Sequence, residues 1–163
     1  MKTLLTVLLV LSCAGSTAQA NDPVTPMVVV SMEGVTHELT TLNWEHSTVT
    51  LLDNEIRFYL TQDDHPVSLN FNLSGTDILE TGSTVYELPE ANQGSAAIDL
   101  NFFNKNRESS RMKRRIVFNK GTIAIEELTP TSLRMTFKGA GNPLTDSAKF
   151  PIEGSVDVLF PDS

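Results

Sequence analysis

Residues 113–138, KRRIVFNKGTIAIEELTPTSLRMTFK, decide the fold because they combine short apolar runs with turn-forming residues. Residues 133–138 alternate apolar and polar side chains at every step, which is the period of a strand with one buried and one solvated face. Pro130 and the hydroxyl residues beside it predict the turn before this strand, because proline already has the φ angle of a turn's second position.

Two further β-rich runs, residues 115–118 and 122–126, lie upstream in the same stretch, with Asn-Lys-Gly at 119–121 between them. Gly121 can supply the positive φ that a short hairpin loop requires. The pattern therefore predicts a hairpin with its turn at 119–121. Together with the strand at 133–138 it forms a three-stranded antiparallel meander.

The chain on both sides repeats this character, with β-rich runs separated by turn residues. Turns are predicted at 33–34 and 53–54 and a loop at 139–143, and no segment predicts a helix. Further strands are expected at residues 27–32, 35–44, 47–52, 55–61, 67–74, 83–88, 96–103 and 150–160. Short alternating strands with frequent turns predict an all-β fold, either an antiparallel β-sandwich or a calyx-like β-barrel of about nine or ten strands.

Residues 1–20 have the three parts of a secretory signal peptide: a positive start with Lys2, an apolar run at 4–11, and small residues at Ala18 and Ala20. The apolar run is too short to span a bilayer, so we expect cleavage before residue 21 and no transmembrane segment in the mature chain. A flexible, proline-containing leader at 21–26 and a single β domain at 27–163 follow. We expect a periplasmic or extracellular protein.

Cys13 offers an alternative, because residues 10–13, Val-Leu-Ser-Cys, partly match the site at which bacterial lipoproteins are cut and lipidated. Lipidation there would tether the protein to a membrane of the cell envelope. In either case the β domain contains no cysteine, so its stability has to come from its core rather than from disulfides.

Positive charge is concentrated in one segment of an acidic chain. Without residues 1–20 the chain has 11 Lys and Arg against 20 Asp and Glu, a formal charge of −9. Seven of the 11 cations lie within 16 residues, and we call residues 105–120 the basic segment. Its cations, which are the candidate ligand-binding residues, are Lys105, Arg107, Arg111, Lys113, Arg114, Arg115 and Lys120.

Such a segment can recognise an anionic glycan, lipopolysaccharide or an acidic protein. The competing interpretation is that these cations cover a hairpin and an edge strand, where charge prevents sheets from associating. Export and overall acidity argue against nucleic acid as the partner.

Catalytic and metal-binding patterns are weak. His37, His46 and His65 stand on separate predicted segments without zinc-ligand spacing, and Asp63-Asp64-His65 lacks the regular oxygen ligands of a calcium loop. Residues 126 and 127, both Glu, are expected at a strand end and to face opposite ways, so they are not expected to form a catalytic pair. We therefore expect no cofactor and no metal, and the weight of these patterns is against an enzyme.

The function predicted from sequence is that of an exported binding protein that recognises an anionic ligand or acidic partner through the basic segment. One alternative is a calyx-type carrier of a small apolar ligand. A second alternative is a hydrolase whose carboxylates come from distant strands and leave no local signature.

Overall fold

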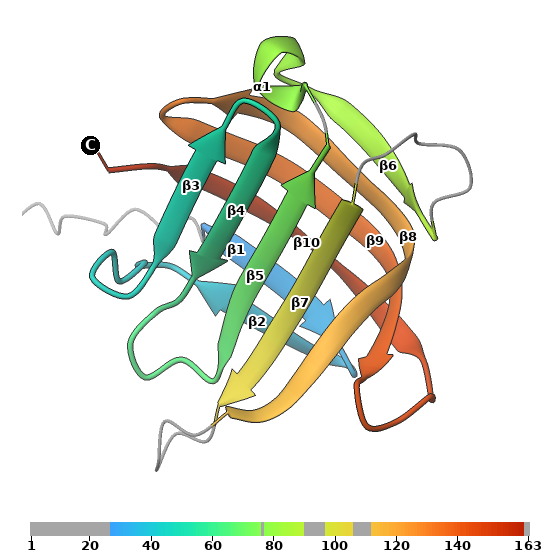
Figure 1. Ribbon diagram of the computed structural model, residues 1–163. Helices are drawn as coiled ribbons and strands as arrows, with labels where there is room; N and C mark the ends of the chain where they lie inside the picture. Colours follow the sequence, from blue (N-terminus) through green and yellow to red (C-terminus); the bar gives the residue numbers. More distant parts are fainter. Residues whose placement is uncertain (1–26, 76, 90–96, 106–111, 162–163) are drawn as a thin grey trace, which may run out of the picture.

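The computed structural model describes residues 27–75, 77–89, 97–105 and 112–161 (Figure 1). The expected all-β fold is confirmed. Ten strands and one short helix follow in the order β1 Val28–Met32, β2 Val35–Leu39, β3 Thr48–Leu52, β4 Glu55–Leu60, β5 Val67–Ser74, α1 Ile78–Thr81, β6 Thr84–Leu88, β7 Ala97–Lys105, β8 Met112–Thr129, β9 Ser132–Pro143 and β10 Phe150–Leu159.

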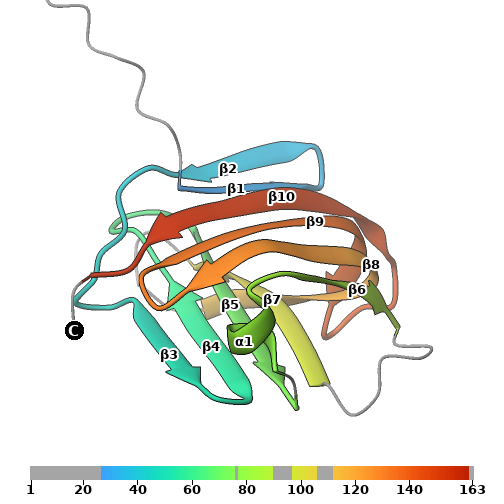
Figure 2. The same ribbon diagram turned by 90° about the horizontal axis from the view of Figure 1, so that it is seen from above.

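All ten strands belong to one antiparallel sheet, in the order β2-β1-β10-β9-β8-β7-β5-β4-β3, with β6 paired to β8. The sheet curls into a half-barrel with two facing layers (Figure 2). The long strand β8 belongs to both layers, because its first part pairs with β7 and residues 121–125 pair with β6. The fold is thus intermediate between the expected sandwich and the expected barrel.

The space between the layers is filled by alternating side chains of the strands. Val28, Val30 and Met32 of β1 are buried, as are Leu133, Met135 and Phe137 of β9. Aromatic rings pack at the centre: Phe137 lies 5.7 Å from Phe102 and 6.0 Å from Phe118 between ring centroids. Burial of these apolar surfaces is the main force that holds the layers together.

The predicted hairpin turn at 119–121 is wrong, because β8 continues through it from Met112 to Thr129. Asn119 is an extra residue in the pairing with β9, which is a β-bulge. Before the bulge the even-numbered residues Ile116 and Phe118 are buried, and after it the odd-numbered Ile123 and Ile125. In the sequence, this shift of the buried positions from even to odd numbers resembles the interruption that a turn produces.

Two glycines face each other where β8 and β9 bend. Gly121, with φ of 129°, is paired with Gly139. A Cβ on Gly121 would lie 2.3 Å from the carbonyl oxygen of Lys138, and one on Gly139 would lie 2.0 Å from that of Lys120. The glycines therefore allow the two backbones to approach closely at the bend, as glycine does in curved sheets.

Two other expectations need correction. Residues 139–143 are the last part of β9 rather than a loop. Gly139 serves there in the close approach of β9 to β8 and does not mark a turn. Residues 78–81 form the short helix α1, which the sequence did not predict.

The predicted turns at 33–34 and 53–54 connect β1 to β2 and β3 to β4 as expected.

The predicted signal peptide, the leader and Cys13 lie outside the described residues. In the described part of the chain no helix is long and apolar enough to cross a membrane.

Candidate functional site

In the part of the chain that the structure describes, the basic segment comprises Lys105, the last residue of β7, and residues 112–120, the first half of β8. Lys105 at the end of β7 pairs with Met112 at the start of β8, and Lys113 is the extra residue of a bulge there. The two basic stretches of sequence thus meet at one end of a hairpin. Arg107 and Arg111 lie outside the described residues, as do the side chains of Lys105 and Lys113.

Arg114 is held by two contacts from the other layer of the half-barrel. Its Nη2 donates to Glu33 Oε1 at 2.8 Å, and its guanidinium carbon lies 5.6 Å from the ring centroid of Phe150. Glu33 stands in the β1–β2 turn with a positive φ of 54°. The side chain of Arg114 remains 31% exposed, so this guanidinium is oriented but accessible.

Arg115 projects from the opposite face of β8. Its Nε donates to Asn101 Oδ1 at 3.0 Å, and its guanidinium carbon lies 5.9 Å from the ring centroid of Phe103. Asn101 is 1% exposed, so the arginine satisfies a buried amide oxygen. Strand alternation therefore separates Arg114 from Arg115, although they are neighbours in sequence.

Lys120 is exposed and lies at the bend of β8, beyond the bulge at Asn119. It is eight residues along the strand from Met112, where β8 begins, so it belongs to a different part of the surface from the hairpin end. The three cations whose side chains the structure describes, Arg114, Arg115 and Lys120, therefore lie on different parts of the surface.

Two histidines meet near Glu33, at the end of the half-barrel that also holds Arg114. His37 of β2 and His65 of the β4–β5 loop have ring centroids 6.1 Å apart in an edge-to-face arrangement. Burial lowers the pKa of His37, and the neighbouring His65 lowers it further, while Glu33 acts in the opposite direction. Nothing in the sequence spacing indicated this contact, because it joins a strand and a loop that are far apart in sequence. We call Glu33, His37, His65, Arg114 and Phe150 the mouth.

A cleft of about 470 Å³ with a mixed polar and apolar surface opens beside the edge strand β3. We call it the seam cleft. Val49 and Leu51 of β3 form one side, and the β8–β9 turn and the C-terminal segment form the other, where Phe160 N donates to Thr131 O at 2.8 Å. Its lining residues are Trp44, Ser47, Val49, Leu51, Pro130, Phe160 and Pro161.

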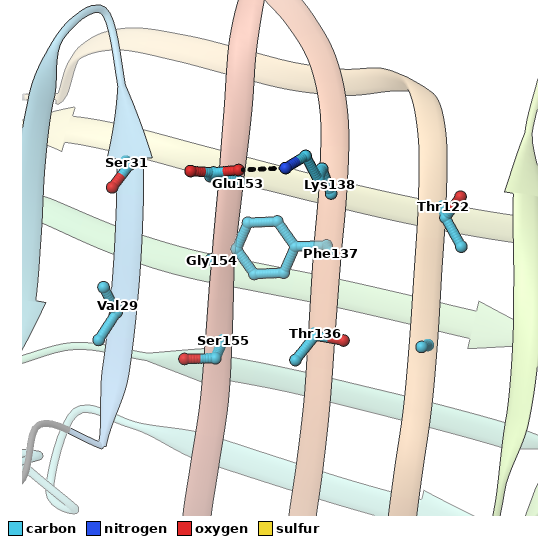
Figure 3. Close-up of a pocket in the computed structure, with 10 residues that line it drawn as sticks. Val29, Ser31, Thr122, Thr136, Phe137, Lys138, Glu153, Gly154 and Ser155 are labelled. Atoms are coloured by element: carbon cyan, nitrogen blue, oxygen red, sulfur yellow. Dashed lines mark ion pairs between the residues drawn. The ribbon is translucent and has the colours of Figure 1, made fainter.

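The outer face of β1, β10, β9 and β8 carries a shallow trough of about 490 Å³ (Figure 3). Small side chains, among them Ser155, Thr136 and Ala124, form its floor. The ion pair between Lys138 Nζ and Glu153 Oε2, at 3.1 Å, borders it. Both charged groups are more than half exposed to solvent, so their ion pair is weak. It does not hold a charged group in a fixed position for a ligand.

Glu126 and Glu127 both reach Arg134, which corrects the expectation that they face opposite ways. Glu126 is an extra residue in the pairing of β8 with β9, so the bulge turns both carboxylates toward that guanidinium. The single guanidinium offsets part of the negative charge of the two carboxylates. This arrangement stabilises the strand surface and is not that of two catalytic acids in a cleft.

Among the described residues, no three His, Cys, Asp or Glu side chains converge as metal ligands would. Comparison of the whole chain with protein-family models, with curated proteins and with solved structures finds no match.

Proposed function

We propose that this is an exported protein that binds an anionic ligand, such as a sulfated or acidic glycan, lipopolysaccharide or an acidic protein surface, through the basic segment. The observation that carries the proposal is Arg114, which Glu33 and Phe150 hold in place while about a third of it stays exposed. A guanidinium that is already oriented loses little side-chain entropy on binding.

The hairpin adds to this site. The pairing of Lys105 with Met112 brings the two basic stretches around residues 105 and 113 to the same end of the sheet as Arg114. An anion at that end would compete with Glu33 for the guanidinium. Arg115 is assigned a different role, because it satisfies the buried Asn101 on the opposite face.

The test is binding of the exported protein to heparin and to lipopolysaccharide at two salt concentrations. A variant with Arg111, Lys113 and Arg114 changed to Ser is compared with a control in which Arg57, Arg134 and Lys138 are changed to Ser. All three control residues form exposed ion pairs elsewhere, so the change in net charge is the same.

We expect the first variant to lose about tenfold or more in affinity and to show a weaker salt dependence, while the control keeps the wild-type affinity. Equal losses in both variants would mean that net charge, and not this site, attracts the ligand. Absence of binding by the wild type to every anion tested would reject the proposal.

A second candidate function, a carrier of a small apolar ligand, is supported by the seam cleft. Its volume of about 470 Å³ falls in the range of small-molecule sites, and the only tryptophan of the chain lines it. A fatty acid bound there should shift the fluorescence of Trp44 to shorter wavelength with a saturable dependence on concentration. An unchanged spectrum would remove this candidate.

A further inference from the structure

From the free edge of β3 we infer that the protein forms a two-fold symmetric dimer, in which β3 of one copy pairs antiparallel with β3 of a second copy along the seam cleft. In the described structure β3 pairs with β4 and ends the path of the sheet. Its other edge therefore presents backbone groups that the sheet does not use.

The register identifies these groups. Leu52 pairs with Glu55 across the two-residue turn at 53–54, and Thr50 and Thr48 continue the same set of hydrogen-bonded pairs. By alternation, the N–H and C=O groups of Val49 and Leu51 point away from β4 toward the free edge. An unpaired strand edge of this kind is a template for another strand.

The strand lacks the features that usually protect an edge. β3, Thr-Val-Thr-Leu-Leu, has no charge, no proline and no bulge. The free strand β2 at the other end of the sheet path contains Glu38 and His37, and β6 contains Glu87 and is followed by Pro89. Of the strands with an open side in the described structure, β3 is thus the one best suited to pairing.

The occupant has to supply backbone hydrogen bonds as well as apolar surface, which an extended peptide does and a lipid does not. The strand is also complementary to itself. With Thr50 on the two-fold axis, Val49 of each copy stands opposite Leu51 of its partner, so apolar side chains meet on the side of the cleft. The outward threonines meet at the axis.

Charge supports pairing at this edge rather than elsewhere. The sequence has a formal charge of −8, so two copies repel each other over most of their surfaces. A contact through an uncharged strand limits that repulsion. The dimer should therefore become tighter as salt is added, whereas the proposed anion binding should become weaker.

Cysteine cross-linking tests the register directly. The full chain carrying Cys13→Ser has no other cysteine, so an introduced one reports on its own position. Thr50 is exposed, and in the inferred dimer Thr50 of the two copies forms a non-hydrogen-bonded pair with Cα atoms about 4.5 Å apart, suitable for a disulfide. Thr48→Cys, also exposed, is the control, since its two copies would lie about 13 Å apart along the strands.

We expect Thr50→Cys to form a disulfide-linked dimer under mild oxidation at least tenfold faster than Thr48→Cys. In sedimentation velocity the wild type should dimerise, Thr50→Lys should be monomeric, and Thr36→Lys, at an exposed threonine of β2, should remain a dimer. Equal cross-linking rates at 48 and 50, or a wild type that stays monomeric at about 100 µM, would overturn the inference. So would the finding that purified wild type is monomeric with a lipid bound in the cleft.

Discussion

The bend of β8 and β9 is shaped by contacts between backbones, whereas the mouth is shaped by contacts between side chains. At the bend, Gly121 and Gly139 face each other and a Cβ on either would collide with backbone atoms. At the mouth, contacts are made by half-exposed polar side chains such as Glu33 and Arg114. Backbone sterics therefore determine the shape of the protein, while weaker and adjustable contacts surround the proposed ligand site.

The largest effect is expected at the core of the bend. Phe137→Ala removes the ring that contacts Phe102 and Phe118, and should lower the free energy of unfolding by about 3–5 kcal/mol. Urea unfolding monitored by circular dichroism measures this. Phe150→Ala at the mouth is the matched comparison and should lower it by less, because Phe150 is only partly buried. Similar losses at both sites would contradict the contrast between them.

A single added methyl group at the bend should have the next largest effect. Gly121→Ala places a Cβ against the carbonyl of Lys138 and should lower the free energy of unfolding by about 3 kcal/mol or prevent folding. Gly34→Ala, at a turn glycine with φ of 76° and open space around it, should lower it by about 1 kcal/mol. If the two variants were equally stable, the close approach of the strands would not be the reason for glycine at 121.

At the mouth we expect a dependence on pH. The pKa of His37 is lower in the folded protein than in the unfolded chain, so the unfolded chain takes up this proton first as the pH falls. The contribution of His37 to stability is therefore complete above about pH 6.5 and is lost as the pH falls through the folded pKa.

Melting temperatures at pH 7.5 and 5.5 test this expectation. His37→Gln should reduce the difference between the two temperatures, and His46→Gln, at an exposed histidine on another segment, should leave it unchanged. A difference that is the same in all three proteins would assign the pH effect to other groups.

The smallest effect on stability is expected for Glu33→Gln. The pair with Arg114 is partly exposed on both sides, and its loss should change the free energy of unfolding by less than about 1 kcal/mol. Gln Oε1 can still accept from Arg114 Nη2, but the competing negative charge is removed, so affinity for heparin should increase severalfold. Reduced affinity would mean that Glu33 is needed to orient Arg114, and unchanged affinity would place the anion elsewhere.

Strand positions were predictable from sequence where the alternation is uninterrupted. Residues 67–74 and 133–138 lie in strands, with buried side chains at the expected positions. The turn before Leu133 was also predicted correctly. Where bulges shift the phase of the alternation, at Asn119 and Glu126, the same rules gave a false hairpin and a wrong orientation for two carboxylates.

The candidate site was predictable to a lesser extent. The cluster of cations is evident from composition, but the contacts of Arg114 with Glu33 and of His37 with His65 join residues that are far apart in sequence. Such contacts depend on how the sheet curls, which no local pattern contains. The seam cleft has the same origin, since Val49 of β3 and Phe160, which follows β10, are far apart in sequence.

The sequence by itself determined the all-β class, the number of strands and the concentration of positive charge, because side-chain alternation and composition are local properties. The tertiary structure decided which layer each cation faces, where the sheet bends and which strand edge stays open. The physical reason is that each bulge adds one residue to its strand, and a shift of one residue moves a side chain to the opposite face of the sheet. Close backbone contacts such as that of Gly121 with Gly139 form only once the sheet has curled.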